Sequence, residues 1–161
     1  MRYSHEPDFI HEVFGHQAML MIPEAQRVLQ KMGLASLGAT QDELQRLAAV
    51  YWYTFEVGLV KCHGQRKILG GAILTSLDES SIAMNPESPT VSLTFDEMAS
   101  EPYLHGIQYS GFQPSYVMAN SPFESEFFPS LESWLDSFLQ KKPFVPLFEA
   151  ESRSILIRRH D

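Results

Sequence analysis

Apolar residues recur at spacings of three and four through the first part of the chain. Residues 8–21 and 24–32 both show this spacing, on either side of Pro23. Because proline is tolerated best in the first turn of a helix, the pattern predicts two helices separated at that residue. Residues 33–38 contain two glycines and a serine and are predicted to form a loop.

A longer helix is predicted to follow this loop. Thr40 and Glu43 stand three residues apart, the spacing of a capping box, in which each side chain bonds to the other residue's backbone amide. Apolar residues with helical periodicity continue from Glu43 to about Lys61, so the helix is expected to span that whole stretch.

The C-terminal third predicts a second long helix and then a change of periodicity. Residues 126–141 place apolar side chains on one helical side, and Phe95 begins a short helix earlier in the chain. Residues 152–158 alternate polar and apolar, as a half-exposed strand does, and are expected to pair with 144–148 as a hairpin. The predicted fold class is mainly α with a small C-terminal β-hairpin, in one domain spanning residues 1–161.

Composition and charge narrow the range of functions. A length of 161 residues with 44% hydrophobic content suits one globular unit. The formal net charge of -8 repels phosphate backbones, so no nucleic acid is expected as a partner. No apolar run approaches the roughly 18 residues that cross a bilayer, so a cytoplasmic protein without membrane contact is expected. Cys62 is the only cysteine, so a metal would be bound by histidine and carboxylate.

Three residues are candidate metal ligands. His11 and His16 stand five apart, which places them about 140° apart around an ideal helix, so both reach one metal only if the helix ends or distorts between them. Gly15 makes such a departure inexpensive. Glu56 lies among aromatic residues, where a buried carboxylate needs a cation. Two imidazoles and a carboxylate form the facial triad of Fe(II) oxygenases, although one surface and one core histidine would explain the same spacing.

Several strings, in order along nearly the whole chain, resemble the pterin-dependent aromatic amino acid hydroxylases. They match the C-terminal part of the family's catalytic domain. The strings are EPDFIHEVFGH at 6–16, GLASLG at 33–38, YWYTFEVGL at 51–59, GGAILTS at 70–76, FQPSYV at 112–117 and KPF at 142–144.

The resemblance implies roles for particular residues. It implies that His11, His16 and Glu56 ligate Fe(II). It also places Glu12 and Tyr51 near a tetrahydropterin, and Pro7, Trp52, Thr75 and Ser76 at the amino acid pocket. Five of these six also have a purely structural interpretation: Tyr51 and Trp52 as core aromatics, Thr75 and Ser76 as helix caps, and Glu12 as a solvated acid.

The implied activity is phenylalanine 4-hydroxylase-like: ring hydroxylation of an aromatic L-amino acid with O2, Fe(II) and tetrahydropterin. The family's N-terminal half-domain and its tetramerisation helix have no counterpart in the sequence. The exposed apolar surface expected from that difference favours self-association or a companion chain. Two alternatives are a catalytically silent metal-binding or interaction module, and a zinc hydrolase with Glu12 as general base.

Overall fold

The computed structural model describes residues 9–123, 125–142 and 144–159. The described chain begins with the π-helical segment η1 (His11–Gln17), the 3₁₀ turn η2 (Met19–Met21) and helix α1 (Pro23–Ser36). The predicted break at Pro23 is confirmed, but the loop predicted at 33–38 is wrong over most of its length. Buried residues on α1 continue through Met32 to Ala35, so the packed face carries the helix past its glycine.

The next helix is capped as predicted and ends earlier than predicted. Helix α2 (Gln41–Tyr51) begins with a capping box of Thr40 and Glu43. It continues as the π-helical segment η3 (Trp52–Glu56), after which the chain enters strand β1 (Leu59–Cys62). The predicted helix to Lys61 is therefore wrong over its last turn, because apolar residues buried in a short strand resemble a helical stripe.

A four-stranded mixed sheet was not predicted. Strand β1 pairs with β2 (Gln65–Ile68) in antiparallel fashion and with β4 (Tyr116–Pro122) in parallel, and β3 (Thr90–Leu93) completes the order β2-β1-β4-β3. The parallel partners are far apart in sequence, so no local pattern reveals them. Four short helices connect the strands: α3 (Gly71–Leu74), α4 (Leu77–Ala83), α5 (Phe95–Met98) and α6 (Glu101–Leu104).

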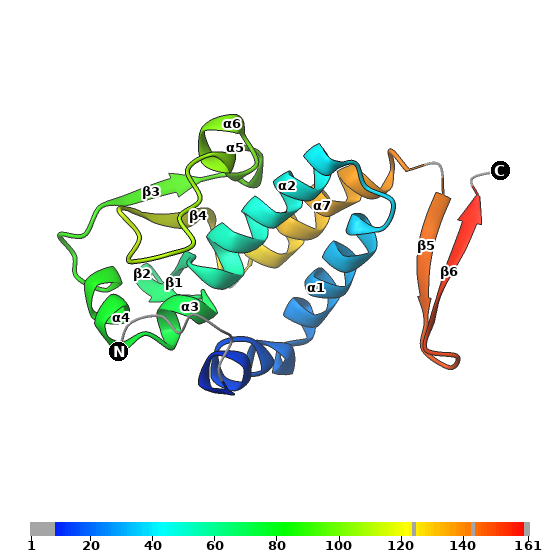
Figure 1. Ribbon diagram of the computed structural model, residues 1–161. Helices are drawn as coiled ribbons and strands as arrows, with labels where there is room; N and C mark the ends of the chain where they lie inside the picture. The colour runs from blue at the N-terminus through cyan, green and yellow to red at the C-terminus, as the bar shows by residue number, and fades with distance from the viewer. Residues whose placement is uncertain (1–8, 124, 143, 160–161) are drawn as a thin grey trace.

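The C-terminal elements follow the prediction. Helix α7 (Phe127–Leu139) packs against α1, and strands β5 (Phe144–Glu149) and β6 (Ser154–Arg159) form the antiparallel hairpin. Figure 1 shows α1, α2 and α7 together in the centre, with the sheet on one side and the hairpin on the other. No helix in the described ranges is long and apolar enough to span a bilayer.

One carboxyl group lies in the interior. Glu79, on α4, is fully buried, and its Oε1 accepts a hydrogen bond from the Gln113 backbone N–H at 2.9 Å. The Tyr116 hydroxyl lies 3.4 Å from the same oxygen. Burial raises the pKa of the Glu79 carboxyl, and these two hydrogen bonds oppose the rise only in part.

Glu79→Gln is expected to change how stability depends on pH. A raised pKa means that the folded chain keeps a proton that the unfolded chain releases, so stability falls as pH rises from the ordinary value of 4.5 through the folded-state pKa. Glutamine cannot ionise, so the variant should escape this fall. Urea unfolding at a series of pH values should show that the free energy of unfolding of the variant rises relative to that of the unaltered chain as pH increases. A relative gain found only at low pH would contradict a buried carboxyl with a raised pKa.

Candidate metal centre

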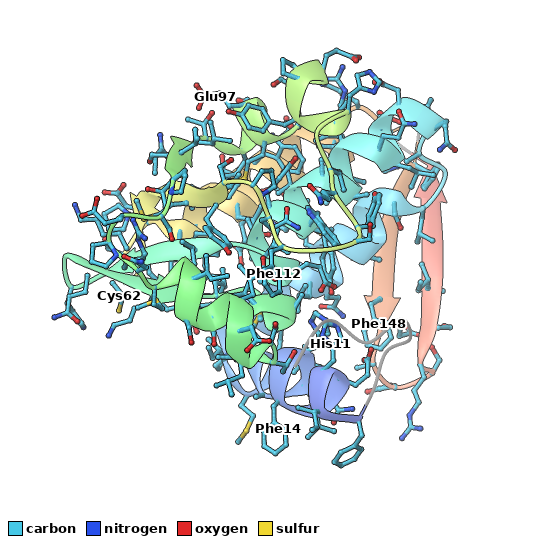
Figure 2. The ribbon with its side chains drawn as sticks, turned by 60° about the vertical axis from the view of Figure 1, so that its left-hand side comes forward. His11, Phe14, Cys62, Glu97, Phe112 and Phe148 are labelled. Atoms are coloured by element: carbon cyan, nitrogen blue, oxygen red, sulfur yellow. The ribbon has the colours of Figure 1, made fainter. Side chains whose placement is uncertain are left out.

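A π-helical turn brings the two histidines to the same side of η1. Hydrogen bonds in a π-helix join residues five apart, so His11 and His16 lie one above the other. The ring centroids are 4.6 Å apart, and the two Nε2 atoms are 2.9 Å apart. The distortion required by the sequence therefore takes the form of a widened turn. In Figure 2, Phe14 points from this segment away from the rest of the chain.

Gly15 has a packing role that was not predicted, in addition to lying within the predicted distortion. Its φ is not positive, and the segment does not end at this residue. A Cβ at Gly15 would lie 3.0 Å from the Cα of Gly71, the first residue of α3. The two glycines let η1 and α3 touch backbone to backbone, which sets the distance between the histidines and the elements behind them.

Glu56 completes the cluster from the end of η3. Its Oε1 lies 3.2 Å from His16 Nε2, and its Oε2 lies 3.7 Å from His11 Nε2. One donor atom from each of the three residues falls within 4.8 Å of the others. Donors about 2.1 Å from a metal and at right angles to one another lie roughly 3 Å apart, so these separations suit one ion bound on a single face.

The electrostatics of the cluster favour a cation. The hydrogen bond to Glu56 is the main cause of a raised pKa at His16, and the charges of Glu56 and Glu12 act in the same direction. Burial, and then the charge of Glu56, raise the pKa of the Tyr51 hydroxyl. Glu12 itself is exposed on η1. A bound divalent ion would neutralise this concentration of negative charge.

Thr75 fixes the proton on His11. Its hydroxyl donates to the Gly71 carbonyl at 2.7 Å, so the oxygen can only accept from His11 Nδ1, which lies 3.4 Å away. An Nδ1–H on His11 makes Nε2 the nitrogen with the lone pair, and this nitrogen faces His16 and Glu56. Such a contact to the outer nitrogen orients a metal-binding imidazole.

Thr75→Ala is expected to weaken metal binding by about 10-fold or more, the usual cost of losing a partner of a ligating histidine. Thr75→Ser keeps the hydroxyl and should bind the metal as the unaltered chain does. Titration of the metal-free proteins with Fe(II) under anaerobic conditions would measure both. Equal weakening in the two variants would assign the effect to packing of the threonine methyl group instead.

A hollow of about 460 Å³ between α1 and α2 opens beside the cluster. Its lining includes Tyr51, Trp52 and Glu56, together with apolar residues of both helices. The Tyr51 ring lies nearly parallel to that of His16, at a centroid distance of 6.3 Å. The Trp52 ring meets Tyr109 edge-on at 4.8 Å, and Trp52 Nε1 is buried with no hydrogen-bond partner among the described residues. A planar ligand would find aromatic surfaces here.

The two remaining residues predicted at the amino acid pocket are Ser76 and Pro7. Ser76 is buried, and its hydroxyl accepts from the Glu79 amide as the N-cap of α4. Pro7 lies outside the described residues. Tyr109 and Glu79 were not identified from sequence. The aromatic run at 51–53 gives no sign of Tyr109, because the loop that carries it is far away in the chain.

Two histidines and one carboxylate converging on one face, beside an aromatic hollow, define the class of non-haem metal centres that leave positions open for further ligands. A family model described as biopterin-dependent aromatic amino acid hydroxylase matches residues 1–160. The chain belongs to this family.

Relatives and solved structures agree with that assignment. The chain is 34% identical to tyrosine 3-monooxygenase of Mus musculus, over 95% of its own length and 29% of the relative's. It is 31% identical to phenylalanine-4-hydroxylase of Caenorhabditis elegans, over 97% and 32%. A structure of Chromobacterium violaceum phenylalanine hydroxylase with bound iron(III) and 7,8-dihydrobiopterin superposes with a TM-score of 0.63 at 30% identity, covering 84% of this chain and 50% of that one. The chain thus spans about a third of the curated relatives and half of the solved structure.

Proposed function

We propose that the chain is the iron-binding part of an aromatic amino acid monooxygenase, with His11, His16 and Glu56 as the ligands of one Fe(II). The convergence of their three donor atoms within 4.8 Å carries the proposal. The substrates would be an aromatic L-amino acid and O2, in a phenylalanine 4-hydroxylase-like reaction. The named relatives are phenylalanine and tyrosine hydroxylases, which supports this substrate class.

Bound Fe(II), together with a tetrahydropterin, would supply the reduction of O2 that inserts an oxygen atom into an aromatic ring. The residues of the chain would hold the metal, orient its ligands and shield the reacting groups from water. Three ligands on one face leave the opposite positions open to exchange. A proton on His11 Nδ1, donated to the Thr75 hydroxyl, would leave Nε2 to bind the metal. Tyr51 and Trp52 line the adjoining hollow, where aromatic surface excludes water from the reacting groups.

The two organic ligands would lie on different sides of the iron. The Tyr51 ring lies beside that of His16, and the charge of Glu12 acts on the same histidine, so we assign both residues to the pterin side. Trp52, Thr75 and Ser76 are assigned to the amino acid side. Thr75 contacts His11 directly, whereas Ser76 would act from within the cap of α4. Pro7 keeps its predicted place at the amino acid pocket as an expectation from sequence.

Turnover tests the proposal. The chain would be loaded anaerobically with Fe(II), then supplied with tetrahydropterin, O2 and phenylalanine, tyrosine or tryptophan in turn. A hydroxylated amino acid formed in step with pterin oxidation is the expected product. One iron per chain without any product would favour the second candidate, a silent metal-binding module.

Exposed apolar side chains support contact with another polypeptide. Phe9 and Met21, on either side of the histidines, are 75% and 84% exposed, and Phe14 between them is 59% exposed. Side chains of this size gathered on one segment favour association. We assign this segment to self-association or to a companion chain, and a monomeric sedimentation profile across concentrations would count against self-association.

A further inference from the structure

Glu79 is the only buried carboxyl among the residues that the structure describes. One of its oxygens accepts from Gln113 N–H, and the other has no hydrogen-bond partner in the described part of the chain. A buried polar atom without a partner costs about 1–3 kcal/mol. A leucine would fill the same space but would leave the buried Gln113 N–H without its acceptor, so the acid at this position serves to hold Gln113 rather than to fill the core.

The position of Glu79 in the chain connects it to the candidate metal centre. Its backbone N–H donates to the Ser76 hydroxyl at 3.4 Å, within the first turn of α4. Thr75 directly precedes Ser76, and the Thr75 hydroxyl contacts His11. The carboxyl therefore holds the start of α4, and with it the Thr75 hydroxyl, against the segment that begins at Gln113.

This anchor matters because α4 is too short to be stable without tertiary contacts. The helix has seven residues, and isolated helices shorter than about 12 residues are marginal in water. Side chains on its outer face are open to solvent, with Leu77 72% exposed. The hydrogen bond from Gln113 N–H to the Glu79 carboxyl is thus a fixed link between the Thr75–Ser76 turn and the chain leading into β4.

We propose that Glu79 is a positioning residue of the iron site: its buried carboxyl fixes the Thr75–Ser76 turn and thereby holds the His11 imidazole in its metal-binding tautomer. The proposal rests on the assignment of His11 as an iron ligand. Glu79 itself touches neither the cluster nor the hollow beside it, and it acts through Thr75.

Two variants of Glu79 and one matched control test this role. Glu79→Leu removes the acceptor and fills the space, whereas Glu79→Gln keeps an acceptor for the Gln113 amide. Leu135→Ala, in the buried face of α7, lowers stability without touching this link. Fe(II) affinity would be measured anaerobically at a temperature where all chains are folded. The His11 tautomer would be read from imidazole ¹⁵N shifts of the metal-free proteins.

Glu79→Leu should bind Fe(II) about 10- to 100-fold more weakly and show a mixed His11 tautomer. Glu79→Gln and Leu135→Ala should keep both the affinity and the tautomer of the unaltered chain. Native affinity and tautomer in Glu79→Leu would overturn the proposal, and so would equal losses in Leu135→Ala. A tautomer change in a chain that never binds Fe(II) would overturn the proposed function while leaving the positioning role in place.

Discussion

Alanine in place of His11, His16 or Glu56 should each remove stoichiometric Fe(II) from the chain. The three donors are the whole set that converges within 4.8 Å in the described residues, so two remaining ligands cannot hold a labile ion on one face. The affinity should fall by more than about 100-fold, because losing a mere partner of a ligand already costs 10- to 100-fold. Metal content after anaerobic loading and desalting measures the loss.

His105→Ala is a suitable control for these three variants. The His105 side chain is 82% exposed, and its Nε2 lies 2.9 Å from a Glu101 carboxylate oxygen on α6. His105 therefore offers a histidine beside a carboxylate, with no third ligand among the described residues, and its replacement should leave the iron content unchanged. If all four variants retained iron equally, the binding would be adventitious and the cluster at His11 would not be the site.

The sequence predicts that the helix is distorted between His11 and His16, but it does not predict the form of the distortion. Two histidines five apart cannot share a face of an ideal α-helix, so a distortion had to be present. The structure supplies it as a π-helical turn, in which Gly15 is packed against Gly71. A contact between residues 56 positions apart has no local pattern, and the glycine was therefore explained from its backbone freedom alone.

The same limit applies to the sheet and to Glu79. The β-hairpin and α7 were predicted because the pattern of polar and apolar residues within each segment alone shows the periodicity of a strand or of a helix. Strand β1 was assigned to the preceding helix, since its parallel partner β4 lies far along the chain. Glu79 was not identified from sequence, because the Gln113 amide that bonds to its carboxyl lies 34 residues away in the chain.

Gly70→Ala should damage the fold and the iron site together. The Gly70 backbone is extended, with φ -68° and ψ 130°, which alanine adopts freely. The obstacle is steric: a Cβ there would lie 2.3 Å from the Glu56 carbonyl oxygen and 2.6 Å from the Gly58 nitrogen. Both contacts are to backbone, so the segment carrying Glu56 must shift. A loss of about 3 kcal/mol or more is expected from such overpacking, together with weakened Fe(II) binding.

Gly33→Ala separates this steric effect from the general effect of replacing glycine. Gly33 lies within α1, and a Cβ there would meet nothing within 4 Å. Alanine should therefore stabilise the chain by about 0.5–1 kcal/mol, because it restricts the unfolded chain and suits a helix. Urea unfolding measures the change in stability of both variants, provided that the slope of the unfolding free energy against urea concentration is the same as for the unaltered chain. A Gly70→Ala chain with unchanged stability and full iron content would mean that Glu56 is not held by this backbone contact.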